Sequence, residues 1–318
     1  MGSMINNQMD NDNKSRMEDS GLEILAHTQS AFERFNLGKI LRMQFLARGE
    51  INNLFLVETN EFGVEVLKIA PRWDGRNEKL KASRNSADLA RSVNVMTPAT
   101  RFIGEWDQDL GNFAIEQYVS GERIVSFENT LSRFSVNIYS ALQRIHSIRV
   151  QGNGELDAQG IGDSLDWQSK LIKYQNESLT SIYASDAHIK IGNPLLDSIG
   201  RELSDTSTII PNMNRLLHGD FKFENLIVIP EGLAVIDWEN AMGGDPLYDY
   251  AFLELFEDLP EFAIPIMNIE NEQEIGEYAA ERFKHYQGTI GLRLLAWYAS
   301  QGDNTRLELF KKRLSERF

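Results

Sequence analysis

Three side chains that carry oxygen ligands flank a short predicted hairpin and could perform chemistry together. Asp220 lies five residues before Asn225, and Asp237 follows the second of two apolar runs at residues 226–228 and 233–236. We expect these runs to form a tight hairpin that gathers the three polar groups at one end. Phosphoryl transfer needs such a set, because one carboxylate can accept a hydroxyl proton while Asn225 and Asp237 bind Mg²⁺ as hard oxygen ligands.

The spacing of Asp220 and Asn225 equals that of the catalytic loop of protein kinases, in which Asp precedes Asn by five residues. In the simplest alternative, both are turn residues and Asp237 is a surface charge. That interpretation is disfavoured, because it leaves three polar groups in an apolar neighbourhood without partners. His218 could act as a base, but a structural role in the loop is preferred.

The elements before the hairpin predict a small antiparallel sheet that carries one helix. A helical pattern covers residues 22–35 and another covers 77–92. Short alternating or apolar runs predict strands at residues 40–47, 53–58, 63–69, 101–104 and 112–119.

After Ser120 and Gly121 the pattern becomes helical, with the hairpin as the one short β-island. The helical stretches are residues 131–145, 167–183, 195–203, 272–283 and 292–300. The sequence therefore predicts an α+β protein with a mobile tail at 1–20, a first lobe at 21–119 and a mostly helical second lobe at 120–318.

Composition excludes several classes of function. The net charge of -15 argues against nucleic-acid binding and favours a cationic substrate, although acidity that serves only solubility is an equal alternative. No run reaches the roughly 18 apolar residues of a membrane span. The chain has no cysteine, which excludes thiolate chemistry and fits a cytoplasmic location. The polar first residues have no apolar core of the kind found in a secretion signal.

Several motifs resemble the aminoglycoside phosphotransferase and choline kinase family. They are His-Gly-Asp at 218–220 with Asn225, then Ala-Val-Ile-Asp-Trp-Glu at 234–239 and Gly-Asp-Pro-Leu-Tyr-Asp at 244–249. The stretches at 102–106, 160–167 and 234–245 are most similar to the hygromycin B phosphotransferase branch.

The resemblance implies a protein-kinase-like fold of two lobes with an ATP or GTP cleft between them. It makes Asp220 the catalytic base and Asn225 and Asp237 the Mg²⁺ ligands. Lys68 resembles the strand lysine that binds the α- and β-phosphates; a lysine that extends along an apolar edge is the alternative. Asp245 and Asp249 are expected to support the loop and to cap the following helix.

Further nucleotide contacts are expected in the first lobe. Glu116 and Tyr118 resemble the hinge whose backbone groups meet the purine, and Gly49 and Asn53 belong to the phosphate-binding loop. The glutamate that usually pairs with Lys68 from a helix has no clear counterpart, and Glu78 is the nearest choice.

The acceptor is expected to be a small cationic, antibiotic-like molecule that is phosphorylated on a hydroxyl group, with the protein a monomer or weak dimer. Its carboxylate contacts would come from Glu239, Glu254, Glu257 and Asp258, for which a solvated helix face is the alternative. A kinase for choline, a sugar or a biosynthetic intermediate remains open. A catalytically silent nucleotide-binding protein is a third possibility.

Overall fold

The computed structural model describes residues 25–49, 51–70, 75–105, 111–124, 131–210, 212–259 and 278–318. The predicted tail at 1–20 and Trp106 of the 102–106 stretch lie outside these residues. The described parts belong to two units, one within Met1–Leu80 and Ala99–Tyr118 and the other within Lys81–Pro98 and Val119–Phe318. The functional roles expected for 21–119 and 120–318 remain predictions.

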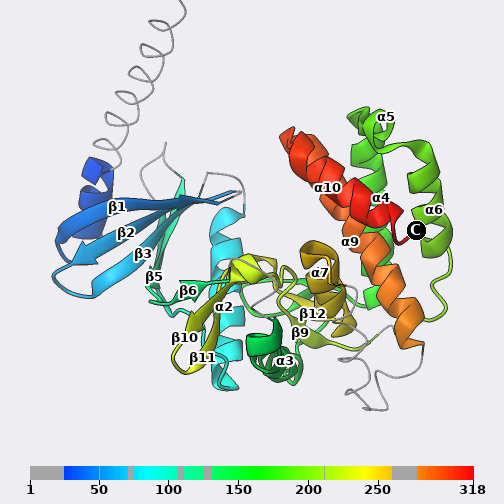
Figure 1. Cartoon of the computed structure of the whole chain (residues 1–318). Helices are drawn as coiled ribbons and strands as arrows, with labels where there is room; N and C mark the ends of the chain where they lie inside the picture. Colours follow the sequence, from blue (N-terminus) through cyan, green and yellow to red (C-terminus); the bar gives the residue numbers. More distant parts are fainter. Residues whose placement is uncertain are drawn as a thin grey trace, which may run out of the picture. The chain divides into compact units, whose positions relative to one another are not determined.

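The first unit is built on a five-stranded antiparallel sheet in the order β1-β2-β3-β5-β4 (Figure 1). Alternation along the strands directs Leu67 and Ile115 to one face, where they form a core with Phe32 of the helical residues 25–34. The strands are β1 (Ile40–Arg48), β2 (Asn53–Thr59), β3 (Gly63–Ala70), β4 (Thr100–Glu105) and β5 (Asn112–Gln117).

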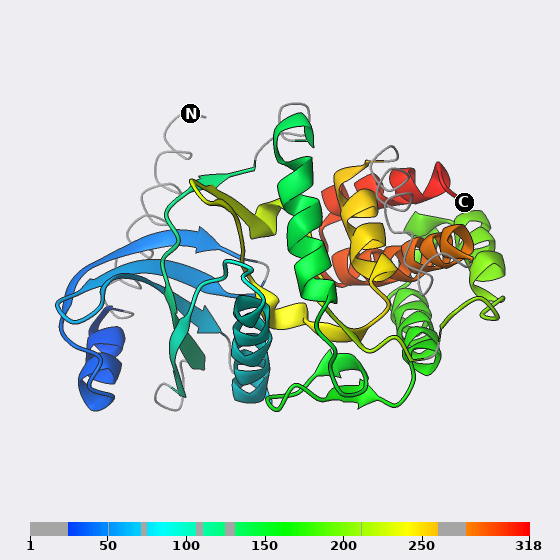
Figure 2. The ribbon, with the colours of Figure 1, turned by 90° about the horizontal axis from the view of Figure 1, so that it is seen from below.

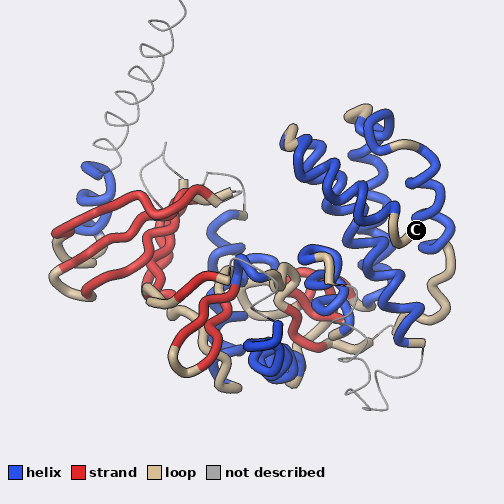
Figure 3. Tube along the Cα trace, in the orientation of Figure 1, coloured by secondary structure: helices blue, strands red, loops and turns tan. Residues whose placement is uncertain are grey.

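Helices make up most of the second unit (Figure 3). Helix α2 (Arg76–Ser92) begins in the first unit and ends in the second. Helix α9 packs against α4, α7 and α10, and its contact with α7 is visible in Figure 2. Besides the end of α2, the described helices of this unit are α3 (Leu131–His146), α4 (Trp167–Ala184), α5 (Ala187–Ile191), α6 (Asn193–Leu203), α7 (Leu247–Glu257), α9 (Ala279–Gln301) and α10 (Asn304–Ser315).

The second unit contains more β-structure than the sequence predicts. The hairpin of β10 (Leu226–Ile229) and β11 (Gly232–Val235) is present, and β10 also pairs with β6 (Glu122–Arg123). A further sheet has the order β8-β7-β12-β9. Its strands are β7 (Asn153–Leu156), β8 (Gly162–Ser164), β9 (Arg215–Leu217) and β12 (Met242–Gly244). The prediction of a single β-island is therefore wrong, because strands of two to four residues are too short to show a period.

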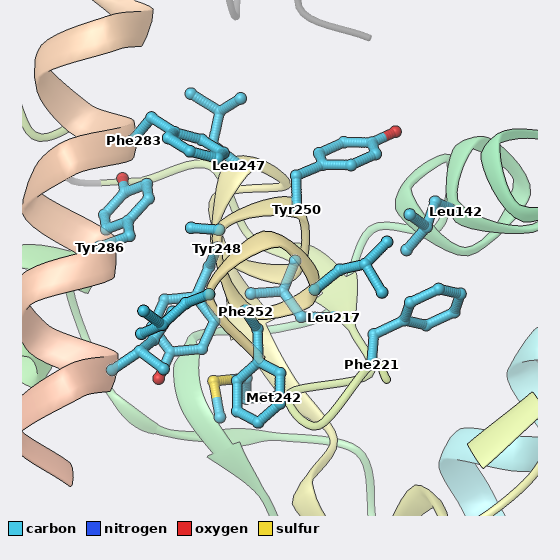
Figure 4. Packing of buried hydrophobic residues seen from close by; sticks show 14 of the residues in the cluster. Leu142, Leu217, Phe221, Met242, Leu247, Tyr248, Tyr250, Phe252, Phe283 and Tyr286 are labelled. Carbon is cyan, nitrogen blue, oxygen red and sulfur yellow. The ribbon is translucent and has the colours of Figure 1, made fainter. Parts of the chain in front are cut away.

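The core of the second unit lies around α7. Tyr248 and Leu247 from this helix are fully buried, and they share one cluster with Leu217, which precedes Asp220, and with Met242, which follows Asp237 (Figure 4). Tyr286 of α9 joins the same cluster. The loop that carries Asp220 is thus attached to the buried core of the unit.

The predicted α+β fold class is confirmed, with an antiparallel sheet in the N-terminal part and a mostly helical C-terminal part. Within the described residues, no helix combines the length and apolar character needed to cross a membrane.

Candidate active site

The β10–β11 hairpin brings Asn225 and Asp237 to the same end. Strand pairing places Leu226 opposite Val235, and the ladder continues beyond the strands because Ile236 N–H donates to Asn225 O at 3.0 Å. Asn225 ends the short 3₁₀ helix η1 (Phe223–Asn225) and is buried. The convergence expected from the sequence is therefore built by backbone hydrogen bonds.

One oxygen of Asp220 is held by two neighbours. Asn225 Nδ2 donates to Asp220 Oδ2 at 3.1 Å and to the Asp220 carbonyl at 2.9 Å. Lys222 Nζ lies 3.2 Å from the same Oδ2. Among the described residues, none forms a hydrogen bond or ion pair with Asp220 Oδ1. The contacts to Oδ2 therefore orient the carboxylate and leave Oδ1 able to accept a hydrogen bond.

Burial raises the pKa of Asp220, and the nearby charge of Lys222 opposes that rise. The negative charge of Asp237 raises it further. A carboxylate with a raised pKa is a stronger base than one in water, and the lysine limits the rise, so the environment favours proton transfer to Asp220.

Asp249 of α7 holds the backbone ahead of the base. Its Oδ2 accepts the His218 N–H and its Oδ1 the Gly219 N–H, both at 2.8 Å. His146 Nε2 lies 3.0 Å from Oδ2, and Asp249 is fully buried. The expected structural role of Asp249 is therefore confirmed.

His218 and Asp245 also have structural contacts. His218 is fully buried, lies 4.8 Å from the Trp238 ring, and places Nε2 3.0 Å from Ile236 O. Asp245 Oδ1 accepts the Leu247 N–H at 3.0 Å, so it caps α7 as expected. These contacts connect the loop before β10 to the residues after β11.

Gly219 and Asp237 have backbone conformations that their positions require. Gly219 has a φ of 77°, and an added Cβ would overlap the carbonyl oxygen of Asn240. Only glycine allows this close approach. Asp237 has a φ of 64° immediately before η2 (Trp238–Asn240), and its side chain does not cap that helix. A non-glycine residue in this region is uncommon, and such conformations concentrate at functional sites.

In the first unit, Lys68 is buried on β3 and lies 3.6 Å from Glu116 Oε1. Glu116 is a strand residue of β5, paired with Val66 and Thr100, and Tyr118 lies exposed just beyond the strand. Glu78 is exposed in the first turn of α2. The structure therefore gives the Glu116 side chain a contact that the hinge prediction did not include.

Glu50 of the expected phosphate-binding loop lies outside the described residues. On either side of it, Gly49 N–H donates to Asn52 O at 2.8 Å, and Asn53 begins β2 opposite Arg48. The roles of Gly49 and Asn53 in nucleotide binding remain predictions.

The four acids expected to bind the acceptor have internal contacts or are buried. Glu257 Oε1 accepts the Phe223 N–H at 2.8 Å, and burial raises its pKa. Glu254 Oε1 accepts from Gln287 at 2.9 Å, and burial raises its pKa as well. Asp258 Oδ1 pairs with Arg317 at 3.0 Å, and Glu239 is buried. Their predicted contact with an acceptor remains untested.

Lys222 is the functional candidate that the sequence reasoning missed. It is buried, lies beside Asp220, and sits 4.7 Å from the centre of the Phe256 ring. The available signal was its position two residues after Asp220, between the His-Gly-Asp motif and Asn225. A lysine there is ambiguous from sequence alone, because only the folded loop turns it towards the carboxylate.

Comparison with known proteins gives matches to sequences and to solved structures. Acyl-CoA dehydrogenase family member 11 from Pongo abelii is 31% identical over 140 residues, which are 43% of this chain and 17% of that protein. The chain thus spans under a fifth of the length of the curated relatives it matches.

Two solved structures share the fold. A thermostable mutant of aminoglycoside phosphotransferase APH(4)-Ia, in a ternary complex with ADP and hygromycin B, has a TM-score of 0.73 at 18% identity, over 91% of this chain and 96% of that chain. The GDP complex of wild-type aminoglycoside 2'-phosphotransferase-IIIa has a TM-score of 0.66 at 16% identity, over 92% and 97%.

The family itself is identified by a sequence model. The model described as the phosphotransferase enzyme family matches residues 42–283, which include most of the first unit and the whole hairpin region. The match agrees with the resemblance seen in the motifs around Asp220, Asn225 and Asp237. The chain belongs to the phosphotransferase enzyme family.

Proposed function

We propose that the chain transfers the γ-phosphoryl group of ATP or GTP to a hydroxyl group of a small molecule, with Asp220 as the catalytic base. The observation that carries the proposal is the arrangement of this carboxylate. Asn225 and Lys222 fix Oδ2, while Oδ1 takes no hydrogen bond or ion pair from the described residues. Oδ1 is therefore the atom that receives the acceptor's proton, a role that contributes about 10²- to 10⁴-fold to the rate.

The residues at the hairpin fit a magnesium ion. Asn225 Nδ2 uses both of its hydrogens on Asp220, so its carbonyl oxygen is the polar atom available to a cation. Asp237 supplies a carboxylate from the adjoining strand end. Mg²⁺ prefers such oxygen ligands and, when bound, would neutralise negative charge on the phosphates.

Positive charge for the phosphates would come from lysines of the chain. Lys222 lies beside the base, where an ammonium group stabilises developing negative charge. Lys68 would contact the α- and β-phosphates, with Gly49 and Asn53 in the adjoining loop and Glu116 and Tyr118 near the purine. ATP and GTP are both retained, because the similar structures contain ADP in one case and GDP in the other.

The first candidate acceptor is a cationic, hygromycin-like antibiotic, so that the enzyme would confer resistance in the cytoplasm. The net charge of -15 and the structural likeness to a hygromycin B complex support it. The internal partners of Glu254, Glu257 and Asp258 weaken it, because these carboxylates are already engaged.

A metabolite kinase is the second candidate. One observation favours it. The engaged carboxylates of Glu254, Glu257 and Asp258 reduce the case for a polycationic acceptor. Choline, sugars and biosynthetic alcohols belong in the same acceptor screen.

The test is an acceptor screen with coupled detection of ADP or GDP release and of an added phosphate by mass spectrometry. Phosphorylation of hygromycin B or another aminoglycoside supports the first candidate, and phosphorylation of choline, a sugar or another metabolite alcohol supports the second. Nucleotide binding without product from any acceptor would favour a silent binding protein.

The residue assignment has its own test in Asp220→Ala. We expect this variant to lose phosphorylation while its affinity for Mg²⁺-nucleotide stays within about threefold, because the base contacts the acceptor and not the nucleotide. Unchanged turnover would remove Asp220 as the base.

A further inference from the structure

Lys68 lies on the sheet face of the first unit that points away from its apolar core. Leu67 and Ile115 pair directly across β3 and β5, and both belong to the core. Because side chains alternate along a strand, Lys68, Ala114 and Glu116 point to the opposite face. The face therefore carries a lysine and a glutamate on adjacent central strands.

The register allows these two long side chains to meet. Ala114 is directly opposite Lys68, and Glu116 is the diagonal neighbour two residues further along β5. The short alanine side chain leaves room above it, and diagonal positions lie within reach of long side chains. The observed distance of 3.6 Å between Lys68 Nζ and Glu116 Oε1 is the result.

Burial strengthens the interaction between Lys68 and Glu116. The side chains of Lys68 and Glu116 are 6% and 16% exposed. An ammonium group that is removed from water needs an opposite charge or hydrogen-bond acceptors. Because the lysine side chain is flexible, it also needs a fixed partner to keep its ammonium group in one position. Protein kinases meet this need with a glutamate from a helix.

We propose that Glu116 of β5 is a positioning residue of Lys68 and holds its ammonium group with a carboxylate from the sheet. The inference rests on the proposed function, in which Lys68 contacts the nucleotide phosphates. Glu116 acts through the lysine, holding its ammonium group where the phosphates meet it. It does not touch the reacting atoms.

The same sheet offers a matched control. Glu65 is also a glutamate of β3, and it pairs with Arg101 Nε at 2.6 Å. It lies opposite Gln117 and in alternation with Leu67, so it belongs to the other face from Lys68. Glu65→Gln removes a strand carboxylate and an ion pair without reaching Lys68.

The experiment measures the affinity of the full chain for AMP-PNP and GMP-PNP with Mg²⁺ by isothermal titration calorimetry. The variants are Glu116→Gln, Lys68→Met, their combination and Glu65→Gln, each checked by thermal unfolding. We expect Glu116→Gln to bind about 10-fold more weakly and Glu65→Gln to bind like the unmodified protein. In the Lys68→Met background, Glu116→Gln should cause no further loss, since coupled residues are not additive.

Two results would overturn the inference while leaving nucleotide binding intact. One is an affinity of Glu116→Gln that equals that of Glu65→Gln, and the other is an equal loss from Glu116→Gln with and without Lys68. If the unmodified protein binds neither nucleotide, the proposed function fails, and this inference fails with it. A purely structural role for Glu116 would appear as a lower unfolding temperature with additive effects on binding, which also counts against the proposal.

Discussion

Replacing Asp249 by Asn tests whether α7 holds the catalytic loop in place. The carboxylate is fully buried and accepts hydrogen bonds from His218 N–H and Gly219 N–H, each at 2.8 Å, with His146 Nε2 at 3.0 Å. An amide has one accepting atom, so in Asp249→Asn at least one of the two backbone donors loses its acceptor and faces an NH₂ group.

The expected cost follows from these contacts. A buried donor left unsatisfied costs about 1–3 kcal/mol, and losing the charge of the acceptor weakens hydrogen bonds worth about 1.5–3 kcal/mol each. Removing one partner from a buried charged group typically costs about 3–5 kcal/mol. For a unit of this size, that corresponds to a fall in Tm of roughly 6–20 °C.

The assay is urea and thermal unfolding followed by circular dichroism, with Asp258→Asn as the matched control. Asp258 is also an aspartate and directly follows the last residue of α7, but its side chain is 46% exposed and pairs with Arg317 at 3.0 Å. Such an exposed pair contributes about 0–1 kcal/mol. If Asp249→Asn loses no more stability than this control, the argument that Asp249 anchors the loop is refuted.

Two further predictions concern charged groups of the second unit. Lys222→Met removes the ammonium group 3.2 Å from Asp220 Oδ2 and should lower turnover about 10²-fold in the ADP-release assay. Lys222→Arg keeps the charge and should lose less activity. Equal activity of the two variants and the unmodified protein would contradict a role for this charge. Burial raises the pKa of Glu254, so its contribution to stability is complete below the ordinary glutamate pKa and is lost as the pH rises through the higher folded value. Glu254→Gln, which can keep the bond from Gln287, should therefore gain stability relative to the unmodified protein as the pH increases, and a parallel pH profile of the two unfolding curves would argue against this.

The long elements could be predicted because each contains enough residues to show a period. The predicted strands at 40–47, 53–58 and 63–69 correspond to β1, β2 and β3 with ends that differ by one residue. The strands β6 and β9 contain two and three residues, and they pair with β10 and β12, which come much later in the sequence. Local pattern carries no signal for such strands, since tertiary hydrogen bonds create them.

The same reasoning separates the predictable part of the site from the rest. Asp220, Asn225 and Asp237 lie within one hairpin and its flanks, so the spacing in the sequence already implies that they converge. Asp249 reaches His218 across 31 residues, because α7 packs beside the loop. The Asp-Pro-Leu-Tyr-Asp segment indicated that this aspartate supports the loop. It did not indicate which backbone groups the carboxylate would bind.

The two lysines that are proposed to bind phosphates share an arrangement that a sequence motif does not reveal. Lys222 is buried and meets the carboxylate of Asp220 two residues before it, and Lys68 is buried and meets Glu116 on the neighbouring strand. Each ammonium group is thus removed from water only where the nearby chain supplies a carboxylate, which offsets part of the desolvation cost. Removing either carboxylate would leave a buried cation that no longer has this partner, whereas removing a lysine from its carboxylate would raise the pKa of the acid. The lysine and its carboxylate are therefore best treated as one unit in each case, and substitutions should be designed and interpreted in pairs.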